Sequence, residues 1–173
     1  MKVLIVVDMQ NDFIDGSLGT KEAVGIVDRV AEVMDSFDGA VICTRDTHFA
    51  DYLEMSEGRK LPVEHCIEGT KGHALQDTIQ KMAEKKQAVV MNKITFGAKN
   101  LPEEIEKLAG GVPEFIELVG LCTDICVISN ALIIKALYPE TKVSIIENAT
   151  AGVTPERKAA ALETAKSCQI NII

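Results

Sequence analysis

Two cysteines four residues apart, Cys122 and Cys126, lie in the segment GLCTDICV, directly after an apolar run. Gly120 permits a tight turn from a strand into a helix at this point. A helix that begins at Thr123 or Asp124 would place Cys126 near its N-terminus, where unpaired N–H groups and the helix dipole lower the pKa of a thiol. Cys126 is therefore a candidate nucleophile. Taken alone, it could equally be a buried core cysteine, because a free thiol behaves as a small hydrophobic group.

Two charged residues at the ends of other apolar runs could assist this nucleophile. Asp8 closes the run that begins at Val3, and Lys93 follows the run Ala88–Met91. A carboxylate buried at such a position needs a cationic partner, and loss of water raises its pKa toward that of a useful base. Each residue alone could be an ordinary strand-end charge. Together with a thiol they supply a base, a cation and a nucleophile.

A third group has the side chains of a metal site. Asp46 and His48 are two residues apart, and His65 follows in the same segment. One carboxylate and two imidazoles, with water in the open positions, suit Zn²⁺, Fe²⁺ or Mn²⁺, although surface histidines are the simpler interpretation. Cys66 is interpreted as structural, because adjacent side chains diverge. His73 is expected to begin a helix and has no assigned role.

The elements that must position these residues are strands and helices in alternation. The strands are continuous apolar runs, as in parallel strands buried on both faces. Between these runs lie segments whose apolar residues recur at helical spacing. This repetition of strand, helix and strand predicts an α/β domain with helices on both faces of a parallel sheet. The six predicted strands are Val3–Val7, Ala40–Thr44, Ala88–Met91, Phe115–Val119, Val143–Ile146 and Ile170–Ile173.

Ligands of such sheets bind outside the carboxyl ends of the strands, where Asp8, Asp46, Lys93 and Cys126 all fall.

Thr154 is a predicted N-cap, with Pro155 in the first turn of the last helix. Residues 45–72 show no clean period, and so long a loop in a compact domain favours a functional role. Two sets of apolar residues predict helices: Ala23, Ile26, Val27, Val30, Val33 and Met34, and then Ile125, Ile128, Ala131, Leu132 and Ile133.

Composition narrows the class of protein. A chain of 173 residues predicts one domain, residues 1–173, and a net charge of −8 argues against a nucleic-acid partner. No apolar stretch approaches the ~20 residues that cross a membrane. Five cysteines, an odd number, do not suggest a disulfide framework, and Cys43 and Cys168 are expected in the core. A reducing cytoplasm is the expected compartment.

Five motifs in order resemble the isochorismatase-like cysteine hydrolases, and among them most closely the nicotinamidases. The resemblance covers nearly the whole chain and implies a six-stranded parallel sheet in a three-layer α/β/α sandwich. It also implies a catalytic triad of Asp8, Lys93 and Cys126. The motifs are VVDMQNDF at 6–13, RDTH at 45–48, HCIEGTKG at 65–72, Lys93 with ITFGA, and GLCTDICV at 120–127.

The same resemblance implies further details of the site. One divalent metal, with zinc first and iron or manganese as alternatives, would be held by Asp46, His48 and His65. A cis peptide between Leu121 and Cys122 would turn the backbone N–H groups of Cys122 and Cys126 into an oxyanion hole. Phe13 and Leu121 would contact the substrate. The implied reaction is hydrolysis of nicotinamide to nicotinate and ammonia through a thioester on the nucleophilic cysteine.

The sequence also departs from the nicotinamidase pattern. It has no tryptophan, and Phe96-Gly97-Ala98 stands where tyrosine-serine-alanine is usual. Two alternatives therefore stay open beside the nicotinamidase interpretation. One is a metal-independent hydrolase of another small amide or carbamoyl compound, and the other is a non-catalytic thiol redox sensor or interaction module. The expected partner is a small-molecule amide, with a homo-oligomer left open.

Overall fold

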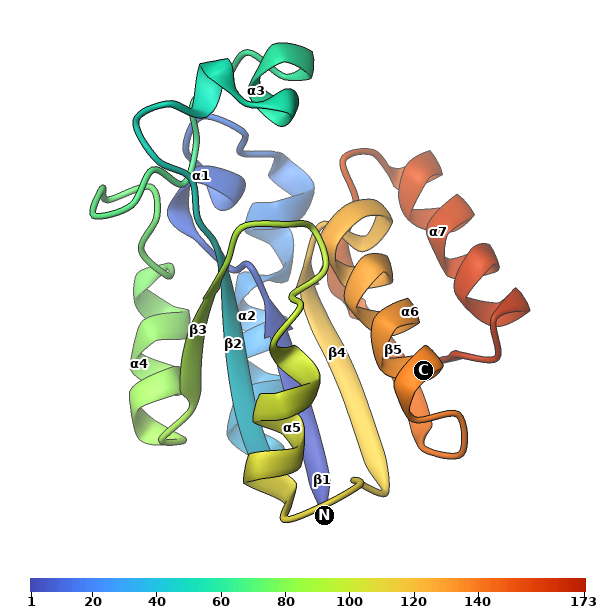
Figure 1. Cartoon of the computed structure of the whole chain (residues 1–173). Coiled ribbons are helices and arrows are strands. Elements are labelled where there is room, and N and C mark those ends of the chain that lie inside the picture. Colours follow the sequence, from blue (N-terminus) through green and yellow to red (C-terminus); the bar gives the residue numbers. More distant parts are fainter.

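A single six-stranded sheet forms the centre of the computed structural model, which describes all 173 residues (Figure 1). The strand order is β3-β2-β1-β4-β5-β6, and every neighbouring pair is parallel, as predicted. Every strand end lies within five residues of its predicted position, and three ends coincide with it. They are β1 Lys2–Val7, β2 Ala40–Asp46, β3 Val89–Lys93, β4 Phe115–Leu121, β5 Lys142–Ala151 and β6 Asn171–Ile172.

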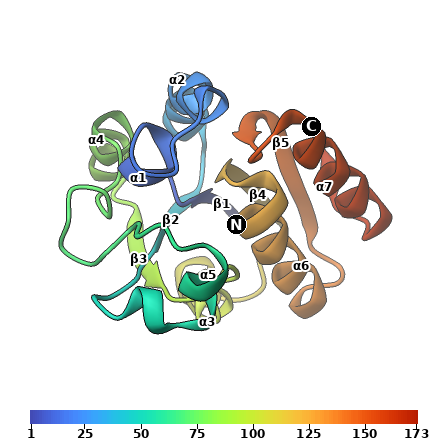
Figure 2. The same ribbon diagram turned by 90° about the horizontal axis from the view of Figure 1, so that it is seen from above.

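Helices cover both faces of the sheet, which confirms the three-layer prediction. Helices α2 and α4 lie on one face, and α5, α6 and α7 lie on the other (Figures 1 and 2). The helical segments are α1 Asn11–Ile14, α2 Lys21–Ser36, α3 Ser56–Lys60, α4 Asp77–Lys85, α5 Leu101–Ala109, α6 Ile128–Leu137 and α7 Pro155–Ser167, with a 3₁₀ turn η1 Tyr52–Glu54 and a π-helical turn η2 Thr123–Val127.

Strand β1 shows why its apolar run is continuous. Leu4 and Val6 pack into the core under α2 and α4, whereas Val3, Ile5 and Val7 pack into the core on the opposite side. All five side chains are fully buried. A strand covered on both faces has no polar side to present, so alternation is absent from its sequence.

The predicted apolar face of α2 and the predicted N-terminus of α7 are confirmed, and the structure adds a cap to α2 that was not predicted. All six residues of the apolar set in α2 are buried, and the side chain of Thr20 caps this helix by accepting the N–H of Ala23. In α7, Thr154 is the N-cap and accepts the N–H of Arg157, with Pro155 in the first turn. Both caps satisfy a backbone donor that the helix leaves unpaired.

Three smaller predictions are wrong. Leu132 is exposed, because α6 buries the face that carries Asn130, Ala131 and Ile134. Cys168 is exposed rather than in the core, because α7 ends at Ser167 and the chain then turns to bury Ile170 instead. His73 lies in a turn and does not begin a helix, since α4 starts at Asp77. Cys43 is buried, as predicted.

The segment 45–72 is not a plain loop. It contains η1 and α3, and Figure 1 shows α3 and α1 above the carboxyl ends of the strands. These short elements cover the edge of the sheet where the candidate residues converge. No helix in the structure is both long enough and apolar enough to cross a membrane.

Candidate active site

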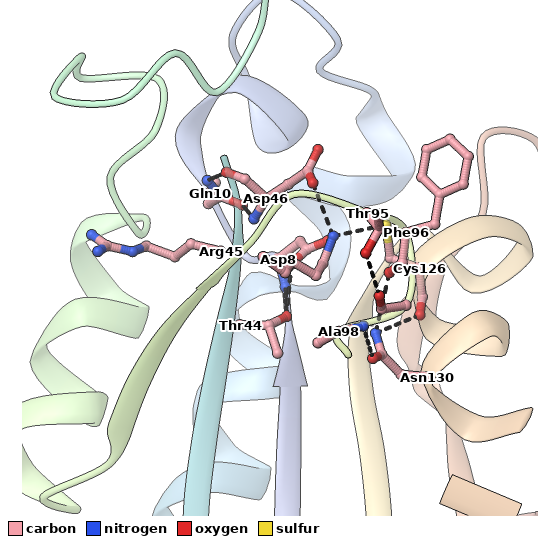
Figure 3. Close-up of polar contacts among 12 residues, drawn as sticks. Asp8, Gln10, Thr44, Arg45, Asp46, Thr95, Phe96, Ala98, Cys126 and Asn130 are labelled. Atoms are coloured by element: carbon pink, nitrogen blue, oxygen red, sulfur yellow. Dashed lines mark hydrogen bonds and ion pairs between the residues drawn. The ribbon is translucent and has the colours of Figure 1, made fainter. Parts of the chain in front are cut away.

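Lys93, the last residue of β3, is the centre of a buried charge cluster. Its Nζ lies 2.8 Å from Oδ2 of Asp8, 3.0 Å from Oδ1 of Asp46 and 3.4 Å from Sγ of Cys126. Figure 3 shows Asp8, Asp46 and Cys126 converging above the strand ends from separate elements. The structure therefore brings together the three residues that the sequence suggested as base, cation and nucleophile. It adds a second carboxylate on the same lysine.

Asp8 is held in an unusual backbone conformation immediately after β1. Its φ of +47° lies in the left-handed region, which a non-glycine residue seldom adopts. Its backbone N–H donates to the carbonyl of Thr44 at 3.2 Å, and the Thr44 hydroxyl donates to Asp8 Oδ1 at 2.6 Å. Thr44 was not singled out from the sequence, because one threonine inside a strand carries no signal of this role.

Burial and charge set the protonation states of the cluster. Burial raises the pKa of Asp8 above its usual range, and the charge of Asp46 adds to this, while Lys93 opposes it. For Lys93, burial alone would lower the pKa, but Asp8, Cys126 and Asp46 outweigh it and raise the pKa. The lysine is therefore a permanent cation in this site, and Asp8 has the character of a base.

The expectation of a lowered thiol pKa at Cys126 is wrong. Complete burial, followed by the charge of Asp8, raises the pKa of Cys126 well above its usual range, and Lys93 opposes this only in part. The negative carboxylate and the loss of water outweigh any effect of the helix end. The thiol at rest is therefore neutral, and it needs a base beside it to react.

The chain reaches Cys126 through a strand end that requires glycine. Gly120 has a φ of +110°, and a Cβ at this position would meet the carbonyl oxygen of Val7 at 2.1 Å. The peptide between Leu121 and Cys122 is cis, as the resemblance implied. The turn η2 then begins at Thr123, where a helix was expected, but its first turn is π-helical rather than α-helical.

Asn130 joins Cys126 to the loop after β3. Its side-chain Nδ2 donates to the carbonyl of Cys126 at 2.8 Å and to that of Phe96 at 3.4 Å. Its Oδ1 accepts the N–H of Ala98 at 2.8 Å (Figure 3). This buried amide was missed in the sequence, where a single asparagine on a helix has no distinctive pattern.

Four side chains form a candidate metal centre next to the lysine. Asp46, His48, Glu57 and His65 bring their ligand atoms within 4.8 Å of one another. The Nε2 atom of His48 lies 3.0 Å from Asp46 Oδ2 and 3.7 Å from Glu57 Oε1. Nε2 of His65 lies 3.8 Å from each of the same two oxygens. Glu57, from α3, was missed, because nothing in its local sequence separates it from other surface glutamates.

The donor set fits a divalent transition metal. The Nδ1 atom of His65 lies 2.8 Å from the carbonyl of Val63. Because a carbonyl only accepts, Nδ1 carries the hydrogen and Nε2 keeps its lone pair for a ligand bond. Burial alone would raise the pKa of Asp46, but the hydrogen bond with His48 and the charge of Lys93 outweigh it and lower the pKa. Two imidazoles and two carboxylates suit Zn²⁺, Fe²⁺ or Mn²⁺.

Gln10 fixes the main chain around Asp46. Its Oε1 accepts the N–H of Asp46 at 2.7 Å, and its Nε2 donates to the carbonyls of Asp46 at 2.8 Å and His73 at 2.9 Å. Cys66 is buried and lies outside the metal group, which agrees with the structural interpretation. Its N–H donates to Asp12 at 2.8 Å.

A cavity of about 520 Å³ opens onto Cys126 and the candidate metal centre. Cys126 lies on its wall, together with Cys122, Asp46 and His65. Phe13 lines it as well, with its ring centroid 5.4 Å from that of His65. The other residue expected to contact the substrate, Leu121, is buried in the core and does not line the cavity.

Comparison with known proteins gives consistent matches over the whole chain. The family model described as Isochorismatase domain matches residues 2–173. The nicotinamidase/pyrazinamidase of Mycobacterium tuberculosis is 27% identical, over 100% of this chain and 98% of that protein.

Two solved structures are similar in fold as well as in sequence. The pyrazinamidase of Pyrococcus horikoshii in complex with zinc has 27% identity and a TM-score of 0.78, with 99% of this chain and 98% of that chain covered. The N-carbamoylsarcosine amidase of Thermoplasma acidophilum has 28% identity and a TM-score of 0.79, with 99% and 94% covered.

Proposed function

Since the chain belongs to the isochorismatase family and is a nicotinamidase-like amidohydrolase, we propose that it hydrolyses nicotinamide to nicotinate and ammonia through a thioester on Cys126. One observation carries this proposal. A carboxylate, an ammonium and a thiol from three different strand ends meet at hydrogen-bond distances beside a cavity. The whole chain would act as one hydrolase domain. Its five free cysteines suit a reducing compartment such as the cytoplasm.

The reaction begins with removal of the thiol proton. Asp8 accepts this proton from Cys126, and Lys93 stabilises the resulting thiolate. The thiolate attacks the amide carbonyl carbon, and the carbonyl oxygen becomes an oxyanion. The backbone N–H groups of Cys122 and Cys126 would stabilise it, because donors fixed in a dry site cost no reorganisation. Asp8 then returns the proton to the amide nitrogen, which leaves as ammonia.

Water completes the cycle. Asp8, again a carboxylate, takes a proton from a water molecule that attacks the thioester carbon. The C–S bond breaks, the carboxylic acid departs, and the proton on Asp8 restores the thiol of Cys126. Each step uses the same carboxylate as base and then as acid, which its raised pKa favours.

Asp46, His48, Glu57 and His65 would hold the divalent metal, with zinc favoured by the zinc-bound pyrazinamidase among the similar structures. When bound, this ion supplies a Lewis acid that can orient the ring nitrogen of the substrate. Phe13 would pack on the ring, because it lines the cavity next to His65.

The direct test is release of ammonia from nicotinamide by the purified protein, measured next to the Cys126→Ala variant. We expect turnover by the wild type and none by the variant. A trapped acyl-enzyme, detected by mass spectrometry after rapid acid quench, would give the mass of a nicotinoyl group on Cys126. Ammonia release by Cys126→Ala at the wild-type rate would refute the mechanism.

A second candidate is hydrolysis of a carbamoyl compound. Its support is the similarity to an N-carbamoylsarcosine amidase, with 28% identity and a TM-score of 0.79. The zinc-bound pyrazinamidase is similar to the same degree, with 27% identity and a TM-score of 0.78. The same triad would attack the carbamoyl carbon. A panel of nicotinamide, pyrazinamide and N-carbamoyl amino acids separates the two candidates. The non-catalytic alternative predicts no ammonia from any of them.

A further inference from the structure

The cavity is larger than a single-ring amide requires. Its volume of about 520 Å³ lies within the roughly 300–1,000 Å³ of sites that enclose drug-sized ligands. Nine of its sixteen lining residues are hydrophobic, so its walls suit an apolar ligand body. A ligand whose amide carbon lies at Cys126 therefore leaves space toward the outer part of the cavity.

Two cations line that cavity from different helices. Lys60 is the last residue of α3, and Arg157 lies in the first turn of α7. Figure 2 shows α3 and α7 as separate helices, so the two cations belong to different elements of the fold. Both residues are exposed, and the side chain of neither takes part in an ion pair or a hydrogen bond.

The carboxylates of the cavity do not neutralise these two cations. Asp46 is engaged by Lys93 and His48, and Glu57 faces the histidines of the metal group. The chain as a whole is acidic, with a net charge of −8, so two unpaired cations in the lining of this cavity do not reflect a general excess of basic residues. An anion in the cavity would find two unpaired positive side chains and no unpaired negative one.

We propose that Lys60 and Arg157 bind a carboxylate of the substrate at the end remote from the scissile amide. The preferred substrate is then a small amide acid with an apolar body, and the inference rests on the proposed amide hydrolysis. A guanidinium can bind both oxygens of a carboxylate, and the lysine adds a second charge to the same monoanion. Both residues are specificity determinants and take no part in the bond-breaking steps.

The test separates binding from turnover. Binding is measured by calorimetry on Cys126→Ala, with 4-carbamoylbenzoate and its methyl ester as ligands that share ring and amide. We expect the acid to bind about tenfold more tightly than the ester at low ionic strength, which two charge-assisted contacts at an exposed rim can supply. Because such contacts are screened, this preference should shrink as salt is added.

Variants identify the two cations. Lys60→Met and Arg157→Met, each in the Cys126→Ala background, should each lower the preference for the acid about threefold, and the double variant should abolish it. Arg59→Met and Lys166→Met are matched controls. Each removes one positive charge from the same helix, α3 or α7, at an exposed residue that does not line the cavity. The controls should keep the full preference.

Turnover by the wild type tells the two proposals apart. If the acid and the ester bind equally, or if the double variant keeps the preference, the carboxylate site is refuted, even when nicotinamide is hydrolysed. If the preference is present but no amide releases ammonia, the proposed function fails and the anion site stands. Tighter binding of 4-carbamoylphenyl phosphate than of 4-carbamoylbenzoate would overturn the assignment to a carboxylate.

Discussion

The Nζ atom of Lys93 lies 3.4 Å from the Sγ atom of Cys126, although 33 positions separate the two residues in the chain. The lysine cannot be the base that removes the thiol proton, because its pKa is raised and it is always protonated. In the proposed mechanism, Lys93 holds a positive charge where the thiolate forms. The proton then moves to Asp8, whose Oδ2 lies 2.8 Å from the same ammonium.

Replacement of the nucleophile should abolish turnover and keep the fold. We expect Cys126→Ala to lower kcat by roughly 10³-fold or more, since the triad acts as a unit. The midpoint of thermal unfolding should stay within a few degrees of the wild type. Cys168→Ala is the control, because this exposed cysteine lies far from the triad in the sequence and outside the cavity. Equal losses in both variants would argue against a nucleophile at Cys126.

The pH dependence should follow Asp8. As the base, Asp8 must be ionised, so kcat/KM should fall as the pH drops through its pKa. Because burial raises that pKa above 3.8, the acid limb of the profile should lie above pH 3.8. Asp8→Asn should lose most of the rate and should not respond to pH in that window. A wild-type limb at or below pH 3.8 would contradict this assignment.

Removal of the positive charge of Lys93 should lower the stability of the fold as well as the rate of the reaction. Lys93→Met leaves two buried carboxylates, Asp8 and Asp46, without their cation, and breaking such a buried pair typically costs about 3–5 kcal/mol. The free energy of unfolding is measured by urea titration. The double variant Lys93→Met/Asp8→Asn should recover part of that loss but no activity. A Lys93→Met protein as stable as the wild type would show that the cluster is not held by this charge.

Metal content should depend on Glu57 as well as on the three residues found in the sequence. Glu57→Gln and His65→Ala should each bind the metal at least about tenfold more weakly. Glu54→Gln, an exposed glutamate three residues earlier, is the matched control. Removal of the metal by a chelator should raise KM more than it lowers kcat, because the ion is proposed to orient the substrate. Wild-type affinity in Glu57→Gln would remove this residue from the site.

Asn130 should matter for both stability and rate. Asn130→Ala leaves the carbonyl of Cys126 and the N–H of Ala98 without their buried partner, at a cost of about 2 kcal/mol. The turn that carries the nucleophile then loses its tie to the loop of Phe96, so kcat should fall. Thermal unfolding and steady-state kinetics measure the two effects. Loss of stability with an unchanged kcat would assign Asn130 a purely structural role.

Regular features of the fold could be read from the sequence because their causes are local. Continuous apolar runs mark strands buried on both faces, and the predicted cap at Thr154 lies directly before the helix that it begins. The convergence of Asp8, Lys93 and Cys126 could also be predicted from the sequence, since the carboxyl ends of parallel strands lie at one edge of the sheet.

The remaining features depend on contacts between distant segments. Glu57 becomes a potential ligand only when α3 folds over the strand ends, and Asn130 becomes a tie only when the loop after β3 lies against α6. The raised pKa of Cys126 has the same origin. Its helix position alone suggested a lowered pKa, but burial and Asp8, neither visible in the local sequence, reverse the sign.

The two carboxylate oxygens of Asp46 contact different groups, one the ammonium of Lys93 and the other the imidazole of His48. Oδ1 lies 3.0 Å from Lys93, and Oδ2 lies 3.0 Å from His48. The negative charge of Asp46 helps to raise the pKa of Asp8. A divalent cation held at Oδ2 would offset that charge, and it would therefore lower the affinity of Asp8 for a proton. By thermodynamic reciprocity, a proton on Asp8 must change the affinity for the cation by the same factor. Through this one shared carboxylate, metal binding and protonation of Asp8 would be coupled equilibria.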